Sequence, residues 1–181
     1  MRRFGLHEYN LLVACPRERE RAAISEIKYF IGDLLEDSGL GVSRTYVSGL
    51  LACSTSLNPF EVVRRLREFA IENPYQFRFA IKFTPIEVCV ETTIPEIVRA
   101  AERLMPKIGD DSFRVSVRKR HTELNSMEVI VAVAHVIPKR VNLDNPDWTV
   151  LVEIVGEWSG VSVLKEEEDI LSIMKMRDDQ Y

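Results

Sequence analysis

The densest group of cationic side chains in this sequence lies between residues 114 and 140. Six bases there face two acids, Glu123 and Glu128, so the stretch has a formal charge of +4. The bases are Arg114, Arg118, Lys119, Arg120, Lys139 and Arg140. Guanidinium and ammonium groups at this density bind phosphates and other anions through charge and hydrogen bonds. The stretch therefore predicts where an anionic partner binds.

The centre of this stretch is the run Arg118-Lys119-Arg120-His121 at the end of a predicted strand. Residues 113–118 alternate apolar and polar side chains, as a strand with one buried face does. An ordinary solvated face would show the same alternation, so that alternative stays open. Consecutive like charges cost stability unless an anion is expected, which favours a binding surface. His121 falls in a predicted loop, where it suits a polar contact to the partner and not catalysis.

The net charge of −4 resides in residues 166–181, which hold six acids and two bases. Residues 1–165 are therefore neutral overall. We expect residues 166–181 to form an acidic C-terminal tail, most simply a solvated stretch.

The sequence shows none of the spacings that mark a catalytic, metal or cofactor site. It has no Walker A loop, nucleophile elbow, dinucleotide fingerprint or pair of histidines at metal-binding spacing. Gly39-Leu40-Gly41 lacks a third glycine and follows a predicted helix, which indicates a turn. His135 lies inside an apolar segment, which predicts a hydrogen-bonded core imidazole. We therefore expect no catalytic residue, no metal, no cofactor and no small-molecule substrate.

Composition and cysteine usage are those of a reduced globular protein. Hydrophobic residues make up 46% and charged residues 29% of the 181 residues. Cys15, Cys53 and Cys89 are an odd set without a CxxC pair, which predicts reduced, buried thiols in a cytoplasmic protein. The longest apolar run, residues 127–137, falls short of the roughly 20 residues of a membrane span, so we expect no membrane contact.

The first 90 residues have the element order of a ferredoxin-like unit. The predicted order is strand, helix, extended or hairpin region, helix and strand. The predicted ranges are 11–14, 16–35, 42–54, 59–72 and 77–90, the last with a break at Pro85. Asn58 can cap the second helix and Pro59 suits its first position, while Asn73-Pro74 stops it.

A second unit follows with two helices and three strands. Thr93 can cap a helix that carries apolar residues as far as Leu104. The strand at 113–118 comes next, and Asn125-Ser126 can cap a helix over 127–137, although its β-branched residues would also suit a strand. Residues 148–155 and 161–164 close the unit as a hairpin.

Three motifs in this second unit occur in the order found in one known family. A strand that resembles the family's Phe-x-Val-x-x-x-Arg pattern begins at Phe113, with Lys119 at the position of the arginine, and a Ser-x-Glu helix start follows at Ser126. A turn of the type Lys-Val-Asp-Leu-x-x-Pro-Asp then precedes the last hairpin in residues 139–147, with Asn142 where the family has Asp. Residues 93–165 thus resemble the THUMP domain, and the ferredoxin-like unit before them is what that family carries N-terminal to THUMP.

The resemblance implies an α+β protein with three parts. These are a ferredoxin-like domain at residues 1–91, a THUMP domain with a mixed sheet at residues 92–165, and the acidic tail at residues 166–181. It also implies tRNA binding, for which we expect a contact set in and around the basic stretch. That set is Arg114, Arg118, Lys119, Arg120, His121, Asn125, Lys139, Arg140 and Lys165.

THUMP domains are mostly fused to RNA-modifying enzymes, and no such catalytic domain is expected in this chain. The chain is similar to stand-alone THUMP proteins that bind tRNA as partners of the acetyltransferase that makes N4-acetylcytidine. The resemblance therefore implies a cytoplasmic, non-catalytic adaptor whose partners are tRNA and a tRNA-modifying enzyme.

Two alternatives stay open. The chain can be the RNA-binding subunit of a split tRNA thiolation or methylation enzyme, or a protein interaction module without RNA binding.

Overall fold

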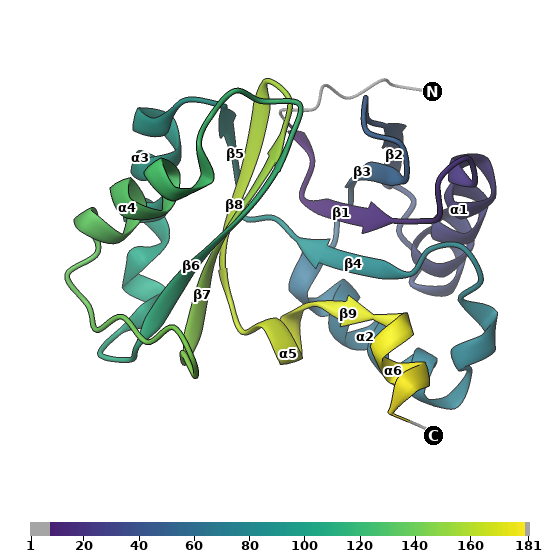
Figure 1. The fold of residues 1–181 in the computed structure, drawn as a ribbon. Helices are drawn as coiled ribbons and strands as arrows, with labels where there is room; N and C mark the ends of the chain where they lie inside the picture. Colours follow the sequence, from purple (N-terminus) through teal and green to yellow (C-terminus); the bar gives the residue numbers. More distant parts are fainter. Residues whose placement is uncertain (1–7, 180–181) are drawn as a thin grey trace. The chain divides into compact units, whose positions relative to one another are not determined.

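The computed structural model describes residues 8–179, in which the chain folds as two units (Figure 1). Of the described residues, the first unit combines 8–85 with 167–179, and the second comprises 86–166. This division differs from the predicted boundary at residue 91, and it assigns the predicted tail to the first unit.

The first unit has the predicted ferredoxin-like topology. Its sheet has the strand order β2-β3-β1-β4-β9, and all neighbouring strands are antiparallel. The strands are β1 (Leu11–Ala14), β2 (Gly41–Arg44), β3 (Leu50–Ser54), β4 (Lys82–Pro85) and β9 (Leu171–Ser172). The helices are α1 (Glu20–Ile27), continued by a π-helical segment over Lys28–Leu34, α2 (Pro59–Glu72) and α6 (Ile173–Asp178). The β2–β3 hairpin confirms the prediction for residues 42–54.

One predicted strand of this unit is wrong in extent. Residues 77–81 lie outside any strand, because the carboxylate of Glu26 accepts hydrogen bonds from the backbone N–H groups of residues 78–80 at 2.7–2.9 Å. Only Lys82–Pro85 joins the first sheet. Residues 88–91, predicted to continue the same strand, pair in the second sheet instead.

The predicted acidic tail is also wrong as a description of residues 166–179. Its four consecutive acids form the short helix α5 (Glu166–Asp169), but Leu171 and Ile173 that follow are fully buried in the core of the first unit. Arg67 donates to the carbonyl of Ile170 at 2.9 Å, and Arg177 donates to that of Phe77 at 2.6 Å. Two apolar side chains and two arginines therefore fix this segment, because apolar burial outweighs the segment's charge.

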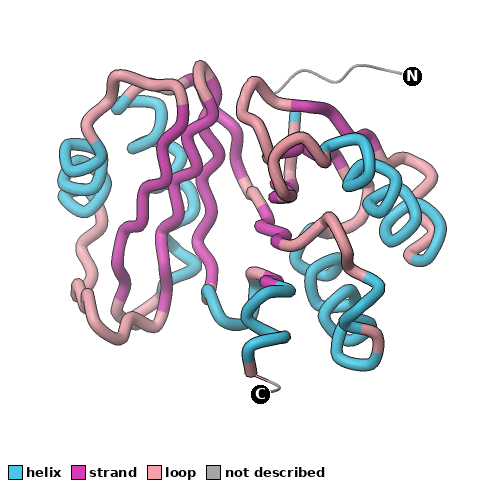
Figure 2. Tube along the Cα trace, turned by 45° about the vertical axis from the view of Figure 1, so that its right-hand side comes forward, coloured by secondary structure: helices cyan, strands magenta, loops and turns pink. Residues whose placement is uncertain are grey.

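The second unit is a mixed four-stranded sheet with the order β5-β8-β7-β6. Strand β6 runs parallel to β7, whereas the other pairs are antiparallel, so the sheet is mixed, as the resemblance implied. The strands are β5 (Val88–Glu91), β6 (Phe113–Arg120), β7 (Trp148–Val155) and β8 (Trp158–Leu164). Helices α3 (Ile94–Leu104) and α4 (Ser126–Val136) pack together on one face of this sheet (Figure 2).

Both helices of the second unit begin at the predicted caps. Thr93 accepts a hydrogen bond from the N–H of Glu96, and Asn125 accepts one from that of Met127 at 2.9 Å. Residues 126–136 are helical despite their β-branched composition, with a capped first turn and with Val129 and Val133 buried in the core. His135 is exposed on α4, so the predicted core imidazole is wrong. Among residues 8–179, no helix has the length and apolarity needed to cross a membrane.

Candidate RNA-binding surface

Strand β6 carries four of the nine predicted contact residues along one edge of the second sheet. Side chains alternate along a strand, so Phe113, Val115 and Val117 face the helices and belong to the core. Arg114 and Arg118 lie on the opposite face of the same strand. The prediction that this strand alternates between one buried apolar face and one polar face is therefore confirmed for residues 113–118.

The nine predicted residues fall into two groups at the two ends of β6. Successive residues of a strand are about 3.3 Å apart, so Phe113 and Arg120 are separated by about 23 Å. The group at the start of the strand is Arg114, Lys139, Arg140 and Lys165. The group at the end is Arg118, Lys119, Arg120, His121 and Asn125. The structure thus does not bring the nine into one patch.

Most cations of the start group have acidic neighbours. Arg114 forms an ion pair with Glu166 at 2.9 Å and donates to a backbone carbonyl. Lys139 lies 3.8 Å from Asp110. Arg140 is exposed and forms no ion pair within residues 8–179. Of this group, Arg140 is the cation most available to an external anion.

Asp147 adds a fixed negative charge to the same end of the sheet. The backbone N–H and the hydroxyl of Ser112 both donate to its Oδ2 at 2.8 Å. These two bonds hold the pKa of Asp147 below its usual value. Desolvation raises this pKa by less than either bond lowers it, and the positive charges of Arg140 and Lys165 lower it further. An anion approaching Arg140 therefore meets a carboxylate nearby, which weakens this end as a phosphate site.

Trp148, which the prediction did not include, lies at this end as well. Its indole N–H donates to Asp111 at 3.0 Å, and Nζ of Lys165 lies 4.9 Å from the ring centroid. Lys107 approaches the ring at 5.9 Å. Lys165 thus rests on an aromatic face, an arrangement that favours a partly desolvated cation. The sequence signal that could have identified Trp148 as part of this site is its position as the first residue of a predicted strand.

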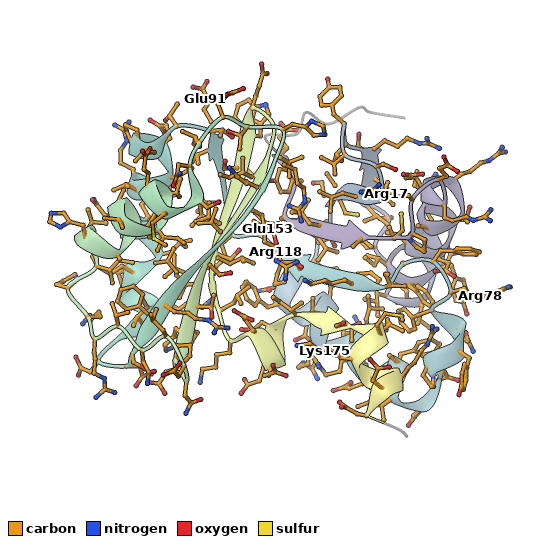
Figure 3. All side chains as sticks on the ribbon, viewed as in Figure 1. Arg17, Arg78, Glu91, Arg118, Glu153 and Lys175 are labelled. Carbon is orange, nitrogen blue, oxygen red and sulfur yellow. The ribbon has the colours of Figure 1, made fainter. Side chains whose placement is uncertain are left out.

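In the group at the end of β6, two cations contact oxygen atoms of the protein and a third is exposed. Arg120 forms an ion pair with Glu153 of β7 at 2.5 Å, and Lys119 donates to the carbonyl of Leu124 at 3.1 Å. Arg118 is exposed and forms no ion pair within the described part of the chain. Figure 3 labels Arg118 and Glu153, which are register partners on the two strands. Arg118 is therefore the principal free cation of this group.

The basic run does not act as a single surface. Because side chains alternate, Arg118 and Arg120 lie on one face of the sheet and Lys119 on the helix side of the strand. His121 follows with a left-handed backbone, at φ 56°, and is exposed where the chain turns away from β6. Asn125 is exposed too, but its Oδ1 accepts the N–H groups of Met127 and Glu128 and so serves the helix cap.

The departure from the family pattern at residue 142 keeps the local turn. Oδ1 of Asn142 accepts hydrogen bonds from the N–H groups of Asp144 and Asn145 at 3.2 and 3.1 Å. A carboxylate oxygen of aspartate would accept the same two bonds. The backbone on either side of Val141 also pairs with Phe113, since the N–H of Phe113 donates to the carbonyl of Arg140 and the N–H of Asn142 donates to the carbonyl of Phe113, which fixes this loop beside β6.

Two of the three thiols are poor nucleophiles at neutral pH. Burial together with the charge of Glu20 raises the pKa of Cys15 to about 11, and complete burial raises that of Cys53 further. Cys15 and Cys53 are buried, as predicted, whereas Cys89 is only partly buried. Within residues 8–179, no three His, Cys, Asp or Glu side chains gather as metal ligands would.

Comparison with known families identifies the second unit. Residues 91–164 match the family model of the THUMP domain, which confirms the resemblance seen in the motifs. The mixed sheet, with β6 at its edge and both helices on one face, is therefore a THUMP domain. The chain therefore contains a THUMP domain, which runs from the last residue of β5 to the end of β8. No curated protein matches the sequence.

Several solved structures share the fold at low sequence identity. PH1313 from Pyrococcus horikoshii Ot3 superimposes with a TM-score of 0.61 at 16% identity, over 91% of this chain and 55% of that one. TrmN from Thermus thermophilus gives 0.53 at 20% identity, over 84% and 44%. A 4-thiouridine synthetase in complex with RNA and ATP gives 0.55 at 14% identity, over 91% and 42%. The chain thus spans about half the length of these proteins.

Proposed function

We propose that this protein binds tRNA through its THUMP domain and presents it to a separate tRNA-modifying enzyme in the cytoplasm. The THUMP domain at residues 91–164 is the observation that carries the proposal. The fold is shared with a 4-thiouridine synthetase whose structure contains RNA, which supports an RNA partner for this arrangement. An exposed guanidinium at Arg118 supplies a contact suited to a phosphate.

The geometry favours recognition of RNA shape over recognition of base sequence. Of the predicted arginines, only Arg118 and Arg140 are exposed without an ion pair in the described residues, and they lie at opposite ends of β6. Two separated phosphate contacts position a folded RNA but read little of its sequence. The remaining specificity then comes from the partner enzyme.

The finer proposal is that the chain is not itself catalytic and that its partner forms N4-acetylcytidine. Acetyl transfer needs a site for acetyl-coenzyme A, and the sequence holds no glycine-rich phosphate loop for one. The high pKa of the Cys15 thiol also disfavours a cysteine acyl carrier at that position. Support for acetylation over thiolation or methylation comes from the sequence resemblance alone.

RNA binding is tested by changing Arg118 to Gln and measuring tRNA affinity across a salt series. The variant R118Q should bind several-fold more weakly, with a slope of log K against log salt shallower by about 0.7 to 0.9, because one phosphate contact is lost. The matched control is R103Q, which neutralises an exposed arginine on α3 of the same domain. Equal behaviour of R118Q and R103Q would contradict the assignment of Arg118.

The catalytic half of the proposal needs two further measurements. Purified protein mixed with tRNA and acetyl-coenzyme A should modify nothing, because the chemistry resides in the partner. Deleting the gene should remove N4-acetylcytidine from tRNA and leave thiolated and methylated nucleosides unchanged. Loss of a thiolated or methylated nucleoside instead would assign the chain to the split enzyme that makes it.

A further inference from the structure

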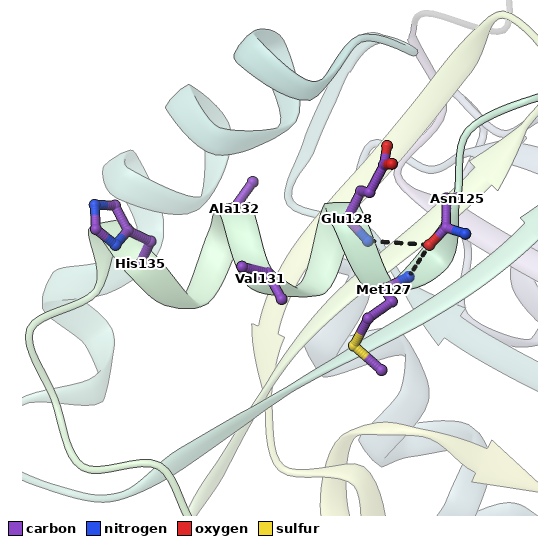
Figure 4. A pocket seen from close by; sticks show the side chains of 6 residues that line it. All are labelled: Asn125, Met127, Glu128, Val131, Ala132 and His135. Carbon is purple, nitrogen blue, oxygen red and sulfur yellow. Dashed lines mark hydrogen bonds between the residues drawn. The ribbon is translucent and has the colours of Figure 1, made fainter.

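The solvent-facing side of α4 is a shallow apolar groove (Figure 4). Met127 and Val131 are 62% and 59% exposed along one side of it. Glu128, Ala132 and His135 line the rest, and the groove has a volume of about 480 Å³. Asn125 closes one end, where its amide caps the helix.

A groove of this kind is unusual on a helix that already buries its other face. Val129 and Val133 point into the core, so α4 is apolar on both sides. A surface helix normally presents polar side chains to water, and an exposed apolar stripe indicates a binding surface. The lining includes a glutamate and neither lysine nor arginine, which disfavours RNA as the occupant.

The spacing of the lining residues fits another helix. Met127, Val131 and His135 are four residues apart and form a ridge along α4. Ala132 beside this ridge leaves space between larger side chains. Helices associate by setting such a ridge into such a groove, and a small residue at the crossing lets the backbones approach.

The groove is complementary to itself. Consider a second α4 antiparallel to the first, related by a two-fold axis that passes between Val131 and Ala132. Residue numbers of opposed positions then sum to 263, so Val131 opposes Ala132, and Glu128 opposes His135. An apolar centre is flanked by two carboxylate–imidazole pairs, one at each end, as a two-fold interface requires. A parallel arrangement would place glutamate against glutamate.

We propose that a second copy of this chain docks on α4 through this antiparallel pairing, to form a two-fold dimer. The face spans about two and a half helical turns. Two such faces bury less surface than the roughly 1,200–2,000 Å² of a stable standard interface. The dimer is therefore weak and forms at high protein concentration or when a shared partner holds two copies together.

Sedimentation of the purified chain tests the pairing. Between about 10 µM and about 1 mM, where weak interfaces associate, the average mass should rise from 20.8 kDa toward twice that value. V131D, which places a charge at the apolar centre, should keep the protein monomeric throughout. Circular dichroism of each variant verifies that α4 still folds.

A charge exchange distinguishes the proposed register from other contacts. E128K and H135E should each weaken dimerisation, because E128K removes the carboxylate that faces the imidazole and H135E opposes two carboxylates across the axis. The double variant E128K/H135E should restore it, because the opposed charges are then complementary again. The matched control E102K makes the same charge change on the exposed side of α3 and should leave dimerisation intact.

Two results would overturn the proposal. The first is a mass of one chain over the whole concentration range, which would leave the groove without a second copy as its occupant. The second is a dimer that V131D leaves intact or that the double variant fails to restore, since such a dimer forms elsewhere on the chain. Neither result bears on tRNA binding, which the R118Q series measures separately.

Discussion

Replacing Leu171 by alanine tests whether the segment after the THUMP domain is part of the first unit's core. Leu171 is fully buried, pairs opposite Phe83 at the edge of the first sheet, and is followed by the equally buried Ile173. Removing a buried leucine side chain costs about 2–5 kcal/mol, because apolar contact is lost and a cavity remains. We expect L171A to lower the free energy of unfolding by about 3 kcal/mol.

The assay must report on the first unit separately. The chain's two tryptophans, Trp148 and Trp158, both lie in the second unit, so tryptophan fluorescence alone is unsuitable. Peptide-resolved hydrogen exchange is the better measurement. Amides of β4, next to the changed strand, should lose protection, whereas amides at the centre of β7 should keep theirs.

A neighbouring residue provides the control. Met174 is half exposed, so M174A should change the free energy of unfolding by no more than about 0.5 kcal/mol. If L171A behaved like M174A, residues 167–179 would not belong to the first unit's core. The predicted description of this segment as a solvated tail would then be restored.

Two further predictions concern carboxylates that organise the first unit. The buried carboxylate of Asp37 accepts hydrogen bonds from the hydroxyl of Thr55 at 2.5 Å and from the hydroxyl and N–H of Ser56. Desolvation raises the pKa of Asp37, but the hydrogen bonds together hold this pKa below its usual value. Because the pKa is lowered in the folded state, the carboxylate stabilises the fold above about pH 4, and this contribution is lost as the pH falls further. D37N should therefore lower the free energy of unfolding by about 1–3 kcal/mol at pH 7. Denaturation at a series of pH values should show a progressively smaller loss below about pH 4. A cost independent of pH would refute this. Glu26 accepts three backbone N–H groups from residues 78–80, so E26A should cost about 3 kcal/mol in urea denaturation, whereas E72A on the exposed end of α2 should cost about 0.5 kcal/mol or less. Equal values for the two would show that these bonds do not stabilise the fold.

Helix starts were predictable because their signals are local. Asn58, Thr93 and Asn125 each accept the N–H groups of the first turn, and each lies a few residues from the groups it satisfies. Periodicity within α4 was equally local. Val129 and Val133 are buried, and at 3.6 residues per turn His135 falls on the other side of the helix. Its exposure could therefore have been predicted once the helix was assigned.

Sheet membership was not predictable from the same kind of signal. Residues 82–90 alternate in the same way whether they belong to one sheet or to two. In the structure, Glu87 joins the segment after Pro85 to the second sheet. Its carboxylate accepts a hydrogen bond from the N–H of Val163 at 2.8 Å, and its backbone N–H donates to the hydroxyl of Ser162. Both partners lie more than 70 residues away in the sequence, so no local pattern identifies them.

The basic surface shows the same division between local and distant information. Strand alternation predicts that Arg118 and Arg120 share a face and that Lys119 does not. It does not predict that Glu153 of β7 pairs with Arg120, or that Glu166 after β8 pairs with Arg114. A cation already paired with a carboxylate gains less from a phosphate, because binding must first separate or share the existing pair. The formal charge of +4 therefore overstates what residues 114–140 offer to RNA, and the affinity should depend mainly on Arg118 and Arg140.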